Sequence, residues 1–240
     1  MRNAFLSRLR IIAVIACASC ATTRLEAAQP YVTDDARLLP AGACQLEIGK
    51  RILRGSREAW VLPACNAFGN MELTLGTNKA NAVDSARTTD FVVQAKGLIR
   101  ELKPDDYGLG WVGGVETHRH PQFGQPRHGS IYAAGIYSHS FLDDAFFIHA
   151  NLGARRLRDE RKTALTWALA AEYNVNERVA VLAEASDTTR SRHAYQAGLW
   201  FSLVPDRIEL DVSVGGDAQN FRQTRYWTVG ARFITPPFLK

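Results

Sequence analysis

Hydroxyl and imidazole groups stand side by side at residues 137–140, Tyr-Ser-His-Ser. A serine beside a histidine base is the pairing that acyl hydrolysis uses. In a strand, however, neighbouring residues point to opposite faces, so His139 does not readily reach Ser138 or Ser140. The sequence therefore predicts no enzyme.

Three histidines could hold a metal ion. His118 and His120 share a face of a predicted strand, and His128 lies across the following loop. Three imidazoles can bind Zn²⁺ or Cu²⁺, but no carboxylate or thiol stands at tight spacing beside them. They remain weak candidates in an exposed loop, and we predict no metal and no cofactor.

The cysteines indicate an exported protein with one disulfide. Cys44 and Cys65 follow the N-terminal segment, and an even pair in an oxidising compartment is typical of a disulfide. A hairpin folded about Ser56, with a link at 54–57, places Cys44 one diagonal step from Cys65. Two free thiols are the alternative.

Alternation of apolar and polar residues runs along most of the chain and positions these groups. Leu165, Trp167 and Leu169, for example, alternate with Thr166 and Ala168. Beyond the N-terminus no apolar run reaches the length of about 18 residues that a membrane helix needs. The pattern predicts strands at 43–54, 57–66, 70–78, 88–102, 107–120, 128–142, 145–157, 162–174, 177–190, 193–204, 206–217 and 224–234.

This strand pattern predicts an all-β fold, a closed antiparallel up-and-down transmembrane β-barrel of about twelve strands. Polar residues at alternate positions are then the candidate lining of its lumen. They are Glu47, Glu72, Gln94, Lys96, Glu116, His149, Asn151, Arg155, Glu172, Glu184, Gln196, Glu209, Asp211 and Arg232. Charges of both signs in a narrow barrel must pair or stay wet, so the lumen could be open or sealed.

The N-terminus has the three parts of a secretory signal peptide: arginines, a short apolar run and small residues. We expect cleavage after Ala21, with Ala28 as the alternative. Cleavage at either site removes a net charge of +3, so the net charge of +5 falls to +2. At that charge we no longer expect nucleic acid as a partner. The predicted divisions are residues 1–21 signal, 22–42 N-terminal periplasmic segment, 43–234 barrel and 235–240 C-terminal tail.

Links between the strands alternate in length. Short ones follow even-numbered strands, and longer ones, rich in Arg, follow most odd-numbered strands. Outer-membrane barrels have short periplasmic turns and long outer loops. The long-loop end would then face outward, with its cations near the phosphates of lipopolysaccharide or steering anions to a pore mouth. Ordinary solvated loop charge is the alternative.

Several N-terminal motifs carry a family resemblance. They are Gln-Pro-Tyr-Val-Thr-Asp-Asp-Ala at 29–36, Gly-Ala-Cys-Gln-Leu-Glu at 42–47, Trp-Val-Leu-Pro-Ala-Cys-Asn at 60–66 and Gly-Asn-Met-Glu-Leu-Thr-Leu-Gly at 69–76. The chain resembles outer-membrane barrel transporters grouped with the MetA pathway of phenol degradation. The resemblance implies a bacterial outer-membrane channel and brings no catalytic residues.

Two further segments have more than one interpretation. Thr33, Asp34 and Asp35 could form a turn, or Asp34 and Asp35 could fold into the periplasmic mouth and meet a cation such as Arg232. The last strand resembles the closing signal read by the barrel-assembly machinery, although residues 234–240 extend past its terminal aromatic.

The function predicted is passive passage of small solutes, including aromatic or hydrophobic ones, through a monomeric outer-membrane barrel. Fifteen or so residues before the first strand are too few for a globular plug. Two alternatives remain: a structural or surface-interaction barrel with a sealed lumen, and a soluble periplasmic β-barrel that binds an apolar ligand.

Overall fold

The structure is a computed structural model that describes residues 31–82, 85–118, 128–157, 162–188 and 193–239. Twelve strands and one short helix follow in chain order. They are β1 Cys44–Leu53, β2 Ser56–Cys65, β3 Met71–Ala82, β4 Ser85–Arg100, β5 Tyr107–His118, β6 His128–Phe141, β7 Phe146–Leu157, β8 Lys162–Asn176, β9 Val179–Thr188, β10 Ala194–Val204, β11 Ile208–Asp217, α1 Phe221–Thr224 and β12 Tyr226–Ile234.

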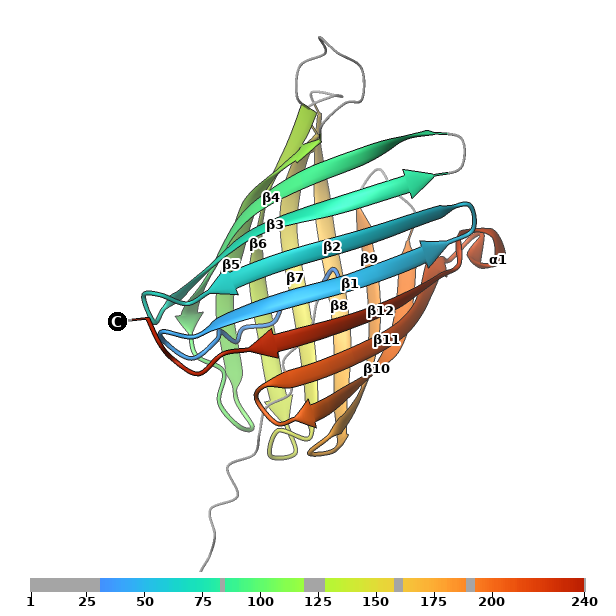
Figure 1. Ribbon diagram of the computed structural model, residues 1–240. Coiled ribbons are helices and arrows are strands. Elements are labelled where there is room, and N and C mark those ends of the chain that lie inside the picture. The colour runs from blue at the N-terminus through green and yellow to red at the C-terminus, as the bar shows by residue number, and fades with distance from the viewer. Residues whose placement is uncertain (1–30, 83–84, 119–127, 158–161, 189–192, 240) are drawn as a thin grey trace, which may run out of the picture.

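Every strand pairs antiparallel with its neighbours in sequence, and β12 pairs with β1 to close the barrel (Figure 1). Closure leaves no sheet edge, which is what an antiparallel sheet needs where water does not satisfy its backbone. The predicted closed antiparallel barrel is confirmed. Among the described residues no helix has the length and apolarity to cross a bilayer.

The first hairpin turns differently from the prediction. Leu53 pairs with Ser56, so only Arg54 and Gly55 form the turn. Gly55 has a φ of 84°, a conformation that glycine adopts without strain. The resulting register sets Cys44 directly opposite Cys65, and the two form a disulfide. The turn expected about Ser56 was therefore wrong by about one residue, while the cysteine pair lies together.

Two links also differ from the sequence prediction. The ladder between β3 and β4 continues to the pair Ala82 and Ser85, so much of the expected long link at 77–87 is strand. The link between β11 and β12 contains α1, which the alternation pattern did not indicate. Hydrogen bonding between adjacent strands sustains β3 and β4 where the apolar alternation has already stopped.

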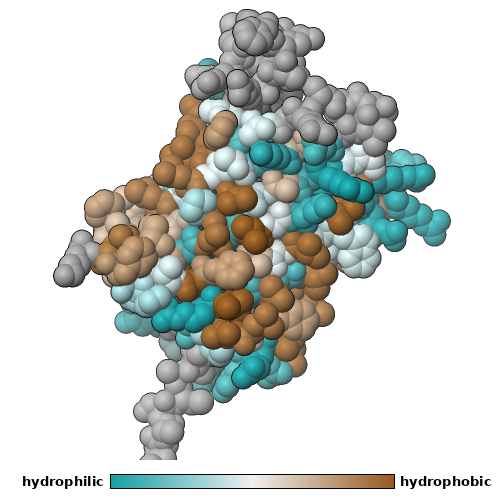
Figure 2. Space-filling view, viewed as in Figure 1, coloured by the Kyte–Doolittle hydropathy of each residue, from teal (hydrophilic) through white to brown (hydrophobic). Residues whose placement is uncertain are grey.

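The outer surface of the barrel is apolar along the middle of the strands. In Figure 2 hydrophobic side chains gather over the strands of the viewed face, and hydrophilic ones gather near the β1–β2 turn. Exposed aromatic side chains lie toward both ends of the strands. Trp167, Tyr195 and Trp227 are near the long-loop end, and Tyr107, Phe141, Tyr173 and Phe233 are near the short-turn end. An apolar band between aromatic girdles is typical of barrels that cross a membrane.

Candidate functional site

The residues predicted to line the lumen all lie on the inner face of the barrel. Ten are buried: Glu47, Glu72, His149, Asn151, Glu172, Glu184, Gln196, Glu209, Asp211 and Arg232. The other four, Gln94, Lys96, Glu116 and Arg155, line the internal cavities described below. Alternate residues of a strand point to the same face, so the period of two that predicted these positions also places their side chains inside the barrel.

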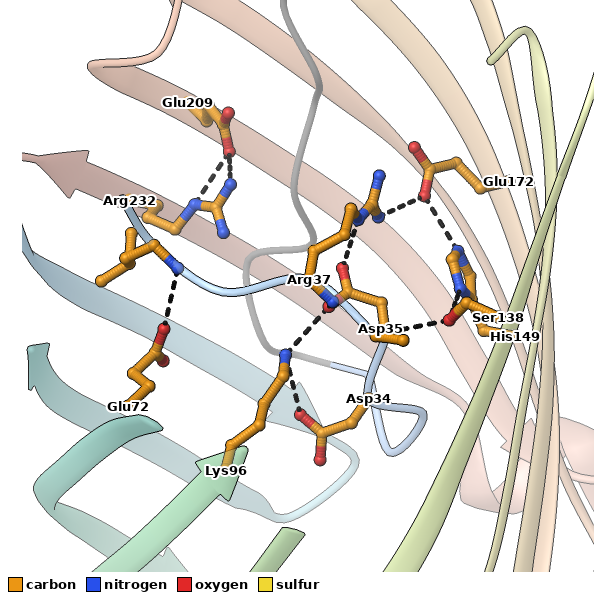
Figure 3. A network of polar contacts seen from close by, with 12 residues as sticks. Asp34, Asp35, Arg37, Glu72, Lys96, Ser138, His149, Glu172, Glu209 and Arg232 are labelled. Atoms are coloured by element: carbon orange, nitrogen blue, oxygen red, sulfur yellow. Dashed lines mark hydrogen bonds and ion pairs between the residues drawn. The ribbon is translucent and has the colours of Figure 1, made fainter. Parts of the chain in front are cut away.

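The lumen also contains residues 31–39, an extended segment that we call the strap (Figures 1 and 3). Tyr31 lies near mid-barrel against Trp200 of β10, with ring centroids 5.8 Å apart, and Leu39 lies near the short turns, where its carbonyl accepts from Asn66 Nδ2 at 2.6 Å. The expectation that 22–42 is a periplasmic segment is wrong for this part. Nine extended residues reach about 30 Å, so a strap needs far less chain than a globular plug.

Polar side chains of the wall hold the first half of the strap. Glu184 Oε2 accepts from both the backbone N–H and the hydroxyl of Thr33, each at 2.6 Å. Asn151 Oδ1 accepts from the Asp34 N–H at 2.6 Å, and Asn151 Nδ2 donates to the Asp34 carbonyl at 2.8 Å. The buried strap backbone is thus satisfied by side chains from β9 and β7.

A buried cluster of charges holds the middle of the strap (Figure 3). The Arg37 guanidinium bonds Asp35 Oδ2 at 2.8 Å and Glu172 Oε2 at 2.9 Å, and Lys96 Nζ lies 2.9 Å from Asp35 Oδ1. We call Asp35, Arg37, Lys96 and Glu172 the latch. Burial opposes ionisation of Asp35, but the neighbouring Arg37 and Lys96 hold the pKa of its carboxyl well below the usual range. The latch therefore links the strap to β4 on one side and β8 on the other.

A hydrogen-bonded chain supports the latch from β6 and β7. The Ala36 N–H donates to Ser138 Oγ at 2.8 Å, and Ser138 Oγ lies 2.8 Å from His149 Nδ1. His149 Nε2 lies 3.2 Å from Glu172 Oε2. Serine, imidazole and carboxylate in this order form a nucleophile–base–acid relay. Here the serine is fully buried and already accepts the strap amide, so the chain anchors the strap.

This contact is not visible in the local sequence, where the histidine next to Ser138 is His139. Ser138 and His149 are cross-strand partners in the β6–β7 register, whereas His139 lies on the opposite face of β6 and stacks on Phe141. The signal that could have found the pair is the register itself, counted outward from the turn at 142–145. Arg37 was missed because no periodicity marks a residue outside the strands.

Arg232 has a different partner from the one expected. Its Nη2 lies 2.6 Å from Glu209 Oε2 on the adjacent strand β11. The strand residue that forms ion pairs with both Asp34 and Asp35 is Lys96. Of the two interpretations of residues 33–35, the structure agrees with the one in which Asp34 and Asp35 fold into the barrel, with Lys96 rather than Arg232 as the wall cation beside them. Glu209 and Arg232 are cross-strand neighbours, a contact that requires no movement of either strand.

The strap divides the lumen into two cavities. The vestibule, a cavity of about 560 Å³, lies on the long-loop side. Tyr31, Trp60, Leu62, Val112 and Tyr132 form apolar parts of its lining. The inner mouth, a cavity of about 720 Å³, lies on the short-turn side, below residues 36–41.

A third and much smaller cavity, which we call the gap, lies beside the strap. It has a volume of about 40 Å³ and is lined by polar groups including Glu47, Glu72, Lys96 and Arg232. That volume holds about three water molecules. The gap therefore admits water-sized species and no larger solute.

Not every predicted residue takes part in these contacts. Asp211 is buried, and neither carboxylate oxygen accepts a hydrogen bond from a described residue. Gln196 and Gln94 accept hydrogen bonds from Tyr226 and Tyr132, which the sequence analysis did not single out. Arg155 and Glu116 form an ion pair in the vestibule at 2.7 Å.

The histidine and signal-peptide predictions fall partly outside the described residues. His118 and His128 stand opposite each other in the β5–β6 register, and His120 lies outside the described residues. Within the part of the chain that the structure describes, no group of three metal-ligating side chains occurs. Residues 1–30, with both predicted cleavage sites, are also outside that part.

The fold and lumen define a class of protein: closed antiparallel β-barrels with an apolar exterior and a charged interior. The chain belongs to the family described as uncharacterised conserved protein UCP029691, whose model matches residues 13–234. A search of curated proteins finds no match.

Several solved outer-membrane barrels share the fold. The KdgM porin has a TM-score of 0.60 at 11% identity, covering 79% of this chain and 98% of that one. The COG4313 outer membrane channel from Pseudomonas putida F1 has a TM-score of 0.58 at 10% identity, covering 84% and 98%. The NanC porin has a TM-score of 0.55 at 12% identity, covering 79% and 98%. The resemblance to the MetA group stays a prediction.

Proposed function

We propose that this protein is an outer-membrane channel for the passive passage of small solutes. The observation that carries the proposal is the reversed polarity of the barrel. Large apolar side chains such as Leu169 and Val181 are exposed outside, while charged ones such as Glu172 and Arg232 are buried inside. A soluble barrel that binds an apolar ligand would need the opposite arrangement. The fold shared with porins and a channel also supports the proposal.

The lining of the vestibule indicates which solutes fit. Trp60, Tyr31 and Tyr132 supply aromatic surface, and Asn151 and Asp34 supply polar groups. One neighbouring structure is a KdgM porin in complex with oligogalacturonate, an acidic sugar. In this chain Glu116 already neutralises Arg155, which does not favour a polyanion. We therefore favour small neutral or amphipathic solutes, including aromatic ones.

The cations at one end of the barrel support an orientation. Arg54, Arg57, Arg156 and Lys162 are exposed near the long-loop end, where lipopolysaccharide phosphates would lie. The first strand begins at Cys44 and the last strand ends at Ile234, and both of these ends lie on the side of the short turns. The long-loop end then faces outward. The signal peptide and the barrel-assembly machinery remain proposed steps in reaching that location, and a monomer is the proposed state.

Conductance through a planar bilayer tests the channel. Protein refolded in detergent should migrate differently on gels before and after heating, and should conduct potassium ions. Ala134→Trp fills the vestibule from the inner face of β6 and should lower conductance, whereas Ile131→Trp, on the outer face of the same strand, should not. A sealed structural barrel is the alternative, favoured by the strap, and absence of conductance in every variant would support it.

A further inference from the structure

The strap lies between the vestibule and the inner mouth, and the gap beside it has lining residues in common with both. The gap shares Leu62, Gln94 and Asp34 with the vestibule and Arg37 with the inner mouth. Of these four, Asp34 and Arg37 belong to the strap itself. Removing the strap would therefore merge three cavities into one lumen.

The barrel does not depend on the strap for its backbone pairing. The ladder closes between β1 and β12 without it, and the strap pairs with no strand. Wall side chains, such as Glu184, Asn151 and Ser138, instead bind its amides. When the strap leaves, water can replace each of these hydrogen-bond partners. Because the ladder is closed without the strap, its withdrawal exposes no sheet edge.

Apolar side chains of the wall contact the strap at two places. Tyr31 packs in a buried cluster with Leu182 and Trp200. Ala36 packs in a second cluster with Val112 and Ile136. Gly198 leaves room for Tyr31, since a Cβ at that position would clash with the phenol oxygen. Beside these apolar contacts, the charged latch joins the strap to β4 and β8.

The C-terminal end of the strap is fixed, which gives it a hinge. The Gly42 N–H donates to the Asn66 carbonyl at 2.7 Å, and the disulfide between Cys44 and Cys65 follows two residues later. Gly42 itself has a φ of 78°, in the region that favours glycine, and Pro40 precedes it. A segment that is fixed at residues 42–44 and pairs with no described strand can swing about that end.

We propose that the strap is a gate that withdraws from the lumen about the hinge at residues 40–42, toward the short-turn end. This inference rests on the proposed channel function and deepens it. The latched state passes water-sized species through the gap, and the withdrawn state passes solutes of the size that the vestibule accepts. The latch sets the population of the two states.

Single-channel recording of latch variants tests the gate. Arg37→Met removes the charge that bridges Asp35 and Glu172, and we expect the fraction of time in a high-conductance state to rise at least about tenfold. A tenfold shift in population corresponds to about 1.4 kcal/mol. Arg155→Met is the matched control, because it removes a lumen guanidinium that bonds the wall residue Glu116 and no strap residue. It should keep the wild-type open fraction.

A tether separates a moving strap from a merely loosened one. Ala36→Cys with Ser138→Cys, placed in the Arg37→Met background, joins the strap to β6 where the amide and hydroxyl now meet at 2.8 Å. The oxidised tether should keep the channel in its low-conductance state, and reduction should restore the high one. Ala36→Cys alone, treated with the same reductant, controls for loss of the native disulfide.

The outcomes distinguish the two proposals. If Arg37→Met folds, as heat-dependent gel migration reports, and conducts like the wild type, the gate is wrong while the channel stands. High conductance in spite of a tether verified by mass spectrometry also overturns the gate. If Arg37→Met does not fold, Asp35→Asn, which keeps the shape of the side chain, takes its place with the same expectation. If neither wild type nor any folded variant conducts, the channel function fails.

Discussion

Arg37 Nη2 lies 2.9 Å from Glu172 Oε2, and both side chains are buried inside the barrel. Arg37 precedes β1, and Glu172 lies near the end of β8, so this ion pair links the strap to the barrel wall. A buried charge that loses its partner is costly, because the low-dielectric surroundings do not replace the lost interaction.

Replacing this carboxylate should therefore destabilise the protein. Glu172→Gln removes one of the two carboxylates that Arg37 bonds in the latch and changes the hydrogen bond to His149. We expect the free energy of unfolding in urea to fall by about 3 kcal/mol. Glu116→Gln is the control, since that carboxylate is partly exposed and should cost about 1 kcal/mol or less. Equal effects of the two substitutions would contradict the buried latch.

The disulfide should stabilise the first hairpin and the hinge of the strap. Cys44 and Cys65 are separated by 21 positions, and a closed loop of that size constrains the unfolded chain by about 3 kcal/mol. Cys44→Ser with Cys65→Ser should lower the free energy of unfolding by about that amount. Urea titration in the oxidised state measures it. The wild type under reducing conditions should match the double variant, and a stability unchanged by either treatment would argue against the bond.

The latch should respond to pH with a defined sign. Arg37 and Lys96 hold the folded-state pKa of Asp35 below its unfolded value, so ionised Asp35 contributes stability above the ordinary carboxyl pKa of about 3.9. That contribution is lost as the pH falls through the lower, folded-state pKa. The stability difference between wild type and Asp35→Asn should be constant from about pH 8 to pH 5 and should shrink below about pH 4. A difference that already shrinks between pH 8 and pH 6 would mean that the pKa is not depressed.

Membrane insertion should depend on the outer face. Leu169 lies in the middle of β8 with its side chain exposed, and Val175 lies near the end of the same strand. An arginine at a bilayer midplane costs about 2–4 kcal/mol, against about 0–1 near an interface. Leu169→Arg should therefore reduce folding into lipid vesicles much more than Val175→Arg. Similar folding of the two variants would be evidence that the apolar belt does not face lipid.

The acidic turns offer a contrast to the buried latch. The backbone N–H of Tyr107, and Arg100 across the turn, lower the pKa of the Asp106 carboxyl. The side chains of Arg100 and Asp106 are each about one third exposed, so solvent screens this contact. The same ion-pair chemistry is therefore structurally important only where the barrel excludes water.

The sequence by itself determined the strands and the faces that they present. Alternation with period two is a local property, so it identified the twelve strands and placed Glu172 and Arg232 inward and Leu169 outward without knowledge of their partners. The cysteine pair could be predicted for a similar reason, since one hairpin brings the two residues together.

Only the tertiary structure decided what fills the lumen. Thr33 and Glu184 are 151 positions apart, and no local pattern records which wall residue a strap amide will meet. Residues 31–39 form no strand, so periodicity is silent about them, and counting residues for a globular plug overlooked how far an extended chain reaches. Barrel closure, which confines every inward side chain to one narrow space, is what brings Arg37, Lys96 and Glu172 together.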